Sequence, residues 1–465
     1  MKKLILENFR CLVARQEVPI KPLTLLVGEN STGKTSFLAA VRLANDLGMG
    51  RSNLDFNEEP FELGSFEQIA FHGAGRRKRA SSFTIGYVGA TLSRTPRKLA
   101  KDSTLLATFE KGTKGSQPAL MELVLDCDPY CISTSMRTDK ERPEQKRIFV
   151  RVKTPSGEFE GHSGSFVHRV EYRFLPPPEI IEVRRAAFLP AYRSFFGALI
   201  EAFFDMSSDS KRPKLKPGAP PEKELNAIMS LAYPEGLSAR PLASPPIRSV
   251  PLPLYDLVRE PFQRTGTHAV PILAELKATA PAEARKLMAD LARFGRDCSL
   301  FQGIDVKPLG GKDAGTVRLT VKIAGRSMNF KDVGYGVSQV LPILVDALGG
   351  RKDQTYLLQQ PEVHLHPRAI AELGTLFGLL AKRDKKTFIV ETHSDFIVDR
   401  IRTEIRRKKK GFVRAKDVAI LYFERENGEV RIHPITIDND GNLVGVPPGY
   451  RQFFLDEERH LLGLE

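Results

Sequence analysis

A glycine-rich loop constrains this chain more than any other feature of its sequence. Residues 28–35 read Gly-Glu-Asn-Ser-Thr-Gly-Lys-Thr, after an apolar run over 23–27 and before a helix-like stretch, Ser36–Leu47. Glycine allows backbone angles that a Cβ forbids, so successive N–H groups can surround a phosphate at the start of a helix. Strand, loop and helix in this order predict a phosphate-binding P-loop, and a plain glycine-rich turn is the alternative.

The two residues at the end of the loop have defined roles in such a site. A P-loop lysine reaches the β- and γ-phosphates, and the hydroxyl residue after it holds Mg²⁺. Lys34 and Thr35 occupy these positions, so ATP and Mg²⁺ are the expected cofactors. The expected nucleotide-binding residues are Asn30, Ser31, Thr32, Gly33, Lys34, Thr35 and Ser36.

Length and cysteine content limit the class of protein. A chain of 465 residues predicts two or three compact units with a sizeable core. Its four cysteines show no zinc-like pairing, which favours reduced thiols. Lys2, Lys3 and Glu7 interrupt the apolar residues at the N-terminus, so no apolar targeting segment is expected there. No apolar run approaches the 18 or so residues that span a bilayer. We expect a cytoplasmic protein without a membrane partner.

The charge balance leaves a nucleic-acid partner open. The formal net charge is +14, and basic residues gather at 76–79 and 406–410. A basic surface attracts polyanions without reading their sequence. Each cluster is also compatible with an ordinary solvated face.

The first 185 residues are expected to form the N-terminal half of an α/β ATPase domain. Two strands, Lys3–Asn8 and Leu12–Ile20, lead into the P-loop strand. Alternating segments then predict an antiparallel β lobe. These segments are Ser82–Gly89, Ala119–Asp126, Cys131–Met136, Arg147–Thr154 and His168–Phe174.

The remainder is expected to contain three parts. Residues 186–299 read as a helical insertion, with helices at Phe195–Met206, Glu222–Leu231 and Pro281–Phe294 and loops at 207–221 and 233–253. Residues 300–437, with a strand at Thr316–Ile323, read as the C-terminal half of the ATPase domain. Residues 438–465 read as a C-terminal extension whose first residues, 438–440, form a turn.

Polar residues end two later strands and supply the second half of the predicted site. The run 355–358 ends in Gln359 and Gln360, and Glu362 follows Pro361. We expect Gln359 to lie with Thr35 on the Mg²⁺ side. A second strand, 387–390, ends in Glu391-Thr392-His393 at the same sheet edge. The segment 330–339 precedes a predicted helix, Val340–Leu348, whose N-terminus is another anion site.

Five motifs in this order resemble the ABC-type ATPases related to RecF, SMC and OLD proteins. They are Leu-Glu-Asn-Phe-Arg at 6–10, the P-loop, Val-Gly-Tyr-Gly-Val-Ser-Gln-Val-Leu-Pro at 333–342, Gln-Gln-Pro-Glu-Val-His-Leu-His-Pro at 359–367 and Glu-Thr-His-Ser at 391–394. The C-terminal extension resembles that of a bacterial subgroup with phage-defence members, among them ATPases of the PARIS type. The resemblance implies an ABC-type ATPase head.

The resemblance also implies a head-to-tail homodimer or larger homo-oligomer with ATP between subunits. Ser338 would then bind nucleotide in trans, and His393 would be the switch histidine. Gln68, in Ser-Phe-Glu-Gln at 65–68, is assigned as the Q-loop residue, with an ordinary surface glutamine as the alternative.

The chain departs from the resemblance at the end of the strand 355–359. An Asp-Glu pair is usual where Gln359 and Gln360 stand, and an amide cannot act as a general base at neutral pH. Glu362, His393 and Gln360 are the candidate catalytic residues, and Glu391 is a further carboxylate for the Mg²⁺ side. His364 and His366 lack an evident third ligand, so a subunit contact is preferred over zinc.

The sequence is compatible with three functions. The first is an ATP-gated switch in phage defence that holds or releases a separate effector, a nuclease or toxin. The second is a RecF-like repair ATPase that clamps DNA. The third is a nucleotide-binding scaffold with little or no hydrolysis, motivated by Gln359 and Gln360.

Overall fold

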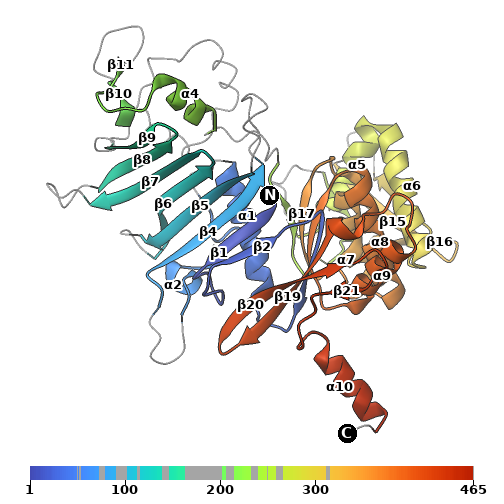
Figure 1. Cartoon of the computed structure of the whole chain (residues 1–465). Coiled ribbons are helices and arrows are strands. Elements are labelled where there is room, and N and C mark those ends of the chain that lie inside the picture. Colours follow the sequence, from blue (N-terminus) through green and yellow to red (C-terminus); the bar gives the residue numbers. More distant parts are fainter. Residues whose placement is uncertain are drawn as a thin grey trace.

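Two large sheets with one helix between them form the core of the protein (Figure 1). The computed structural model describes residues 1–49, 51, 54–72, 79–90, 102–112, 116–138, 146–162, 202–205, 214–231, 239–248, 250–257, 265–309 and 315–463. The α/β class with an antiparallel β lobe, expected from the sequence, is confirmed by this topology.

The first sheet has eight strands in the order β2-β1-β4-β5-β6-β7-β8-β9, all antiparallel. Its strands are β1 Lys3–Glu7, β2 Gln16–Pro19, β4 Ser82–Ala90, β5 Asp102–Lys111, β6 Pro118–Cys127, β7 Tyr130–Thr138, β8 Lys146–Thr154 and β9 Gly157–His162. Six of these strands confirm predictions. The sequence prediction omitted β5 and β9, although β5 alternates between buried and more exposed positions as a half-buried strand does.

The second sheet carries the P-loop strand at its centre. Its order is β12-β17-β18-β3-β19-β20-β21, and the first five strands are parallel. The bounds are β12 Leu242–Ser244, β17 Thr355–Gln359, β18 Thr387–Glu391, β3 Leu23–Gly28, β19 Val418–Glu426, β20 Glu429–Ile437 and β21 Leu443–Val444. The middle strands are continuous apolar runs because helices or the other sheet cover both of their faces.

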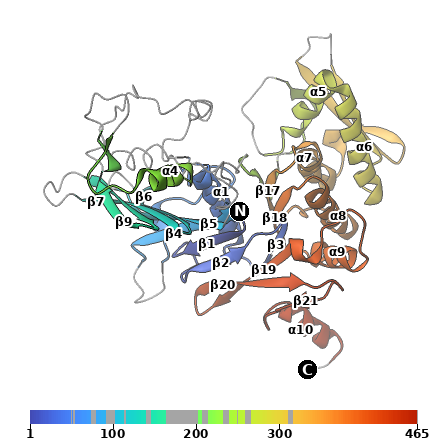
Figure 2. The same cartoon turned by 45° about the horizontal axis from the view of Figure 1, so that its top comes forward.

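Helix α1, Lys34–Gly48, lies between the two sheets (Figure 2). Its Phe37 ring packs edge-on against Phe423 of β19, and the same apolar cluster reaches Phe83 of the antiparallel sheet. The opposite face of the central sheet is covered by α7 Tyr335–Gly349, α8 Pro367–Arg383 and α9 Asp395–Arg406. The P-loop therefore joins a strand and a helix that are both fixed by packing.

The region expected as a helical insertion contributes to the core. Helices α4 Glu222–Leu231, α5 Ala269–Thr279 and α6 Pro281–Asp297 are present, and α5 and α6 share the apolar cluster of α7. Three expectations are wrong in part. The predicted helix Phe195–Met206 lies mostly outside the described residues; Ala202 and Phe203 are helical, but strand β10 Phe204–Asp205 follows them. The predicted loops 207–221 and 233–253 contain β11 Lys214–Leu215, paired with β10, and β12, paired with β17. Pairing with another strand decides these elements, and local periodicity does not show it. The domain boundaries stay a prediction.

A smaller sheet and four short elements complete the fold. The small sheet has β13 Tyr255–Asp256, β15 Thr316–Ile323 and β14 Gly303–Pro308, with β16 Arg326–Asn329 paired to β15. The short elements are α2 Phe66–Ile69, η2 Phe330–Asp332, η3 Ala415–Asp417 and the C-terminal α10 Gln452–Leu461. The predicted strand His168–Phe174 lies outside the described residues. No helix in the described parts of the chain has the length and apolar character needed to span a membrane.

Helix α7 begins five residues before the predicted Val340–Leu348 helix. Gly334 is its N-cap, and Tyr335 and Gly336 form its first turn. The apolar run that suggested the helix starts only at Val340, because the first turn carries residues of low hydrophobicity. Ser338 consequently lies inside the helix.

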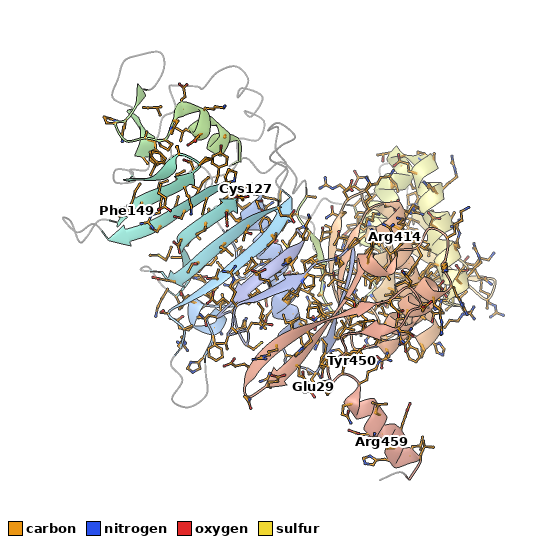
Figure 3. The ribbon with its side chains drawn as sticks, viewed as in Figure 1. Glu29, Cys127, Phe149, Arg414, Tyr450 and Arg459 are labelled. Carbon is orange, nitrogen blue, oxygen red and sulfur yellow. The ribbon has the colours of Figure 1, made fainter. Side chains whose placement is uncertain are left out.

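The chain leaves the core through the predicted turn at 438–440. The Asp438 carboxylate accepts hydrogen bonds from the backbone N–H groups of Asp440 and Asn442, at 2.9 and 2.8 Å, which confirms the turn. Tyr450 packs edge-on against Tyr422 of β19 at the base of α10 (Figure 3). Beyond it, α10 projects away from the rest of the chain (Figure 1).

Candidate nucleotide-binding site

The P-loop has the backbone geometry of a phosphate cradle. Gly28 and Gly33 have φ values of +136° and +87°. A Cβ at Gly28 would lie 2.4 Å from the carbonyl oxygen of Phe423, and a Cβ at Gly33 would lie 2.6 Å from the Cys11 Sγ. Both positions therefore require glycine, as the sequence predicted.

Helix α1 offers free donors at its N-terminus. Gly33 is the N-cap and supplies no side-chain cap, and the first turn contains no acidic residue. The first N–H groups of a helix lack intrahelical partners and lie at the positive end of its dipole. This cradle fits a nucleotide phosphate chain, which would satisfy these donors.

The Lys34 side chain lies against the P-loop. It is buried, and Nζ donates to the carbonyl oxygens of Gly28 at 3.0 Å and Glu29 at 2.5 Å. Burial lowers the pKa of Lys34, while the nearby Glu391 and Glu29 carboxylates oppose that shift. An ammonium group held by carbonyl oxygens in this way can exchange them for phosphate oxygens.

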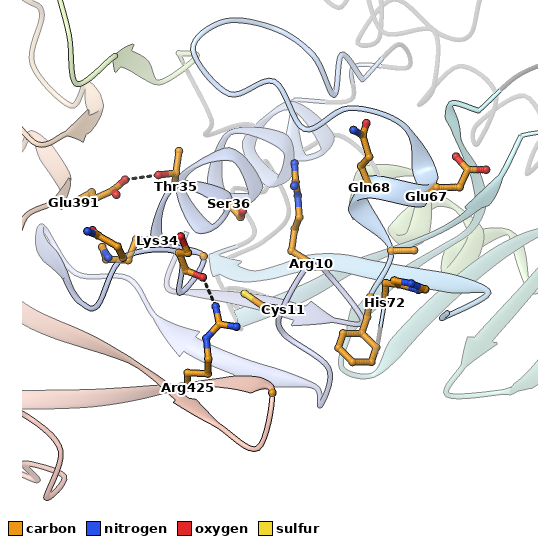
Figure 4. Close-up of a pocket in the computed structure, with 16 residues that line it drawn as sticks. Arg10, Cys11, Lys34, Thr35, Ser36, Glu67, Gln68, His72, Glu391 and Arg425 are labelled. Atoms are coloured by element: carbon orange, nitrogen blue, oxygen red, sulfur yellow. Dashed lines mark hydrogen bonds between the residues drawn. The ribbon is translucent and has the colours of Figure 1, made fainter. Parts of the chain in front are cut away.

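A pocket of about 450 Å³ opens beside the loop, which is large enough for a nucleotide (Figure 4). Among the residues lining it are six of the seven predicted nucleotide-binding residues: Asn30, Ser31, Gly33, Lys34, Thr35 and Ser36. Thr32 is buried beneath the loop, and its hydroxyl donates to the Glu29 carbonyl at 2.8 Å.

Two arginines line the same pocket and were absent from the sequence prediction. Arg425, near the end of β19, donates to the Ser31 carbonyl at 2.5 Å, and Arg10 donates to the Leu63 carbonyl at 2.6 Å. The two residues are 415 positions apart in the chain, from 10 to 425, so only the fold brings them together. They make the pocket electropositive, which suits a polyphosphate.

Thr35 contacts a carboxylate from the neighbouring strand. Its hydroxyl donates to Glu391 Oε2 at 2.8 Å (Figure 4). Glu391 ends β18 and is 6% exposed, and burial raises its pKa despite the bond from Thr35 and the charge of Lys34. A carboxylate and a hydroxyl at this spacing offer the oxygen ligands that Mg²⁺ prefers.

Gln359 is next to Glu391 in the sheet register, so the two side chains come from corresponding positions on parallel strands. Gln359 is buried, and its Nε2 has no hydrogen-bond partner in the described part of the chain. Gln360 has a left-handed φ of +41° and donates its backbone N–H to the Glu391 carbonyl at 2.8 Å. The metal-side role of Gln359 and the catalytic role of Gln360 stay predictions.

Glu362 is held against the segment that carries His393. Its Oε1 accepts from the Thr392 hydroxyl at 2.7 Å and from the His393 backbone N–H at 2.9 Å. Its Oε2 is buried without a partner in the described residues, and burial raises the pKa of Glu362. A carboxylate with a raised pKa and a free oxygen is suited to accept a proton from water.

His393 lies close enough to Lys34 for its titration to be affected. Burial, followed by repulsion from the Lys34 ammonium, lowers the pKa of His393. The imidazole is therefore neutral at physiological pH and can both donate and accept hydrogen bonds. This is compatible with the predicted contact to a γ-phosphate.

Gln68 lines the P-loop pocket as a Q-loop residue would (Figure 4). Its Oε1 accepts from the Ser65 backbone N–H at 2.8 Å, so the side chain also caps the short helix α2. Its assignment to nucleotide stays a prediction.

Ser338 is buried, and its hydroxyl donates to the Tyr335 carbonyl at 2.9 Å. Tyr335 is exposed at the start of α7. None of the described residues 334–338 lines the P-loop pocket. In one subunit, this segment and the P-loop therefore do not form a common pocket.

The His-x-His pair is split between two local roles. His364 has a left-handed φ of +65°, and its ring lies 5.6 Å from the ring of Tyr335. His366 caps α8 by accepting the Arg368 N–H through Nδ1 at 3.3 Å. Among described residues, these histidines belong to no three-ligand cluster. Their proposed subunit contact remains untested.

The basic clusters do not line the P-loop pocket in the described residues. Four of the five residues 406–410 are exposed after α9, and Lys409 pairs with Glu404 at 3.4 Å. Residues 76–78 lie outside the described residues, and Arg79 is exposed.

A P-loop between a central parallel strand and a packed helix, with a carboxylate beside its threonine, defines a P-loop nucleotide-binding fold. Residues 1–73 match the family model of the AAA ATPase domain. Residues 226–399 match that of the AAA domain described as "putative AbiEii toxin, Type IV TA system". Over these two stretches the chain is similar to ATP-binding domains of the AAA ATPase type. No curated protein matches the chain.

Several solved structures are similar at low identity. An Smc head bound to the C-winged helix domain of ScpA has 11% identity and a TM-score of 0.40, covering 94% of this chain and 98% of that chain. An Smc head with an extended coiled coil, bound to a ScpA domain derived from Pyrococcus furiosus, has 12% identity and a TM-score of 0.37, with coverage of 98% and 99%. The SMC head domain from Thermotoga maritima has 12% identity and a TM-score of 0.36, with coverage of 93% and 98%.

Proposed function

We propose that this protein is an ABC-type ATPase switch that hydrolyses ATP between two subunits and thereby holds or releases a separate effector protein. The observation that carries the ATPase proposal is the Thr35–Glu391 contact at 2.8 Å. It supplies a carboxylate on the metal side of the P-loop although Gln359 and Gln360 are amides.

Residue roles follow from this arrangement. Lys34 contacts the β- and γ-phosphates, and the free N–H groups of α1 surround them. Thr35 and Glu391 would hold Mg²⁺, which when bound would neutralise negative charge on the phosphates. Glu362 accepts the proton of the attacking water, and neutral His393 hydrogen-bonds the γ-phosphate.

A homodimer is proposed because the motif 333–342 would need the nucleotide site of a second subunit. Tyr335 is exposed at the N-terminus of α7, yet the described residues 334–338 lie outside their own subunit's P-loop pocket. A second copy, placed head to tail, would bring that helix terminus to a γ-phosphate. Small movement of the buried Ser338 would let its hydroxyl join this contact.

The defence role rests on the family match over residues 226–399, whose description names a putative toxin of a toxin–antitoxin system. We propose that ATP-driven closure of the dimer controls an effector nuclease or toxin encoded separately. Copurification of the protein with products of neighbouring genes, with and without Mg·ATP, tests this part. Recombination proteins in place of a nuclease or toxin would favour the RecF-like alternative.

The ATPase part is tested by steady-state phosphate release from wild type, Lys34→Ala and Glu362→Gln. Glu404→Gln is a matched control, because Glu404 is buried on α9 but pairs there with Arg400 and, beyond the helix, with Lys409. We expect turnover in wild type and control, and a loss of about 100-fold or more in both site variants. Wild-type ATP binding without turnover would instead establish the scaffold function that Gln359 and Gln360 suggest.

The remaining alternative is a RecF-like DNA clamp, which the net charge of +14 favours and which duplex DNA tests. DNA-stimulated turnover with a steep salt dependence would identify a DNA clamp. Turnover that is indifferent to DNA, together with Mg·ATP-dependent dimerisation in sedimentation, supports the protein-effector switch.

A further inference from the structure

A buried arginine joins helix α7 to the end of β17. Arg248 is 2% exposed and follows β12 by four residues. Its backbone N–H donates to the Gln339 side-chain oxygen at 2.9 Å, and the Gln339 side-chain nitrogen donates back to the Arg248 carbonyl at 3.2 Å. Gln339 directly follows Ser338 in α7.

The guanidinium of Arg248 extends this contact to the end of β17, three residues before Glu362. One terminal nitrogen donates to the Gln339 carbonyl at 3.2 Å, and the other donates to the Gln359 carbonyl at 3.3 Å. Its Nε donates to the Ser244 hydroxyl at 3.2 Å. One side chain thus contacts β12, the N-terminal part of α7 and the last residue of β17.

Arg248 forms no salt bridge with any described carboxylate, and its side-chain hydrogen bonds go to carbonyl and hydroxyl oxygens. Burial lowers its pKa to about 10, and the Glu362 charge counteracts this shift. Glu362 Oε2 is itself buried without a hydrogen-bond partner in the described residues. A buried cation held only by neutral groups is costly, so its position is sensitive to any movement of the groups around it.

We propose that Arg248 is a positioning residue that couples the first turn of α7 to the end of β17, so that the position of Ser338 determines that of Glu362. This inference rests on the proposed ATPase function. When a partner's nucleotide engages the N-terminus of α7, Gln339 moves with that turn. Arg248 then transmits the displacement to Gln359 and, three residues further on, to Glu362.

The coupling is tested in the full chain with Arg248→Met, Gln339→Leu and the double variant, beside Arg248→Lys. Arg240→Met is a matched control, because Arg240 is also partly buried but contacts Asp46 and Glu58. Arg248→Met and Gln339→Leu should each lower kcat at least tenfold, with KM and the Kd for ATP within about twofold. The double variant should be no worse than Arg248→Met, and Arg248→Lys should recover only part of kcat.

A second readout does not depend on turnover. Hydrogen exchange at residues 360–363 should rise in Gln339→Leu, whose hydrogen bonds reach the end of β17 through Arg248. In Arg240→Met, exchange at 360–363 should rise no more than in the rest of the core. No rise at 360–363 in Gln339→Leu beyond that of the core, or unchanged kcat in Arg248→Met with only a lower Tm, would overturn the coupling. An inactive wild type would overturn the proposed hydrolysis instead, and the exchange experiment would still decide the coupling.

Discussion

The replacement Glu391→Gln isolates the metal-side carboxylate of the site. Glu391 is 6% exposed and accepts the Thr35 hydroxyl at 2.8 Å. Glutamine keeps the length of the side chain and one acceptor oxygen, so the variant loses mainly the charge. We expect Mg²⁺-dependent ATP binding to weaken while binding in EDTA changes little.

The magnitude follows from the contact itself. A hydrogen bond to a charged group contributes about 1.5–3 kcal/mol and a neutral one about 0.5–1.5 kcal/mol, so the charge accounts for about 1–1.5 kcal/mol. Since 1.4 kcal/mol corresponds to a factor of ten, affinity should fall roughly tenfold. A divalent cation interacts with the carboxylate more strongly than a hydroxyl does, which makes tenfold a lower bound.

The assay is a titration with a fluorescent ATP analogue at several Mg²⁺ concentrations and in EDTA, with Glu404→Gln as control. A second variant makes the assay more specific, because Gln359 and Glu391 occupy adjacent register positions on β17 and β18. Gln359→Glu in the Glu391→Gln background should restore part of the Mg²⁺ dependence. Equal weakening with and without Mg²⁺, or none at all, would refute a metal-side role for Glu391.

Three further results are expected. Gly33→Ala should weaken ATP binding at least tenfold, because alanine at φ +87° costs about 1–2 kcal/mol and its Cβ lies 2.6 Å from Cys11 Sγ; if Cys11→Ala restores binding fully, the backbone angle is not the cause. Arg240→Met should destabilise the fold by about 3 kcal/mol in denaturant unfolding, because it leaves the 2%-exposed Asp46 carboxylate without its 2.6 Å partner, and a change under about 1 kcal/mol would contradict this. Burial raises the pKa of Glu362 above its ordinary 4.5, so its contribution to stability is full below pH 4.5 and is lost as the pH rises through the folded pKa. Glu362→Gln should therefore flatten that part of the Tm–pH profile, and an unchanged profile would contradict a raised pKa for Glu362.

The sequence by itself determined the P-loop and most of the sheets. Gly28 and Gly33 are needed by local backbone angles, and Lys34 and Thr35 follow them at fixed spacing, so these residues carry their roles in a short stretch. Buried strands such as β3, β17 and β18 consist mostly of apolar residues, which local composition also reveals.

The tertiary structure decided which candidates meet at the site and which residues join them. Parallel pairing brings Glu391, a candidate from the sequence, beside Thr35, 356 residues away. Strand β19 brings Arg425, which the sequence did not suggest, to the P-loop. The buried Arg248 gives no signal in its own segment, because its partners Gln339 and Gln359 are about a hundred positions distant. Local sequence specifies backbone geometry and burial pattern, whereas side chains from distant strands meet only through the register of the folded sheet.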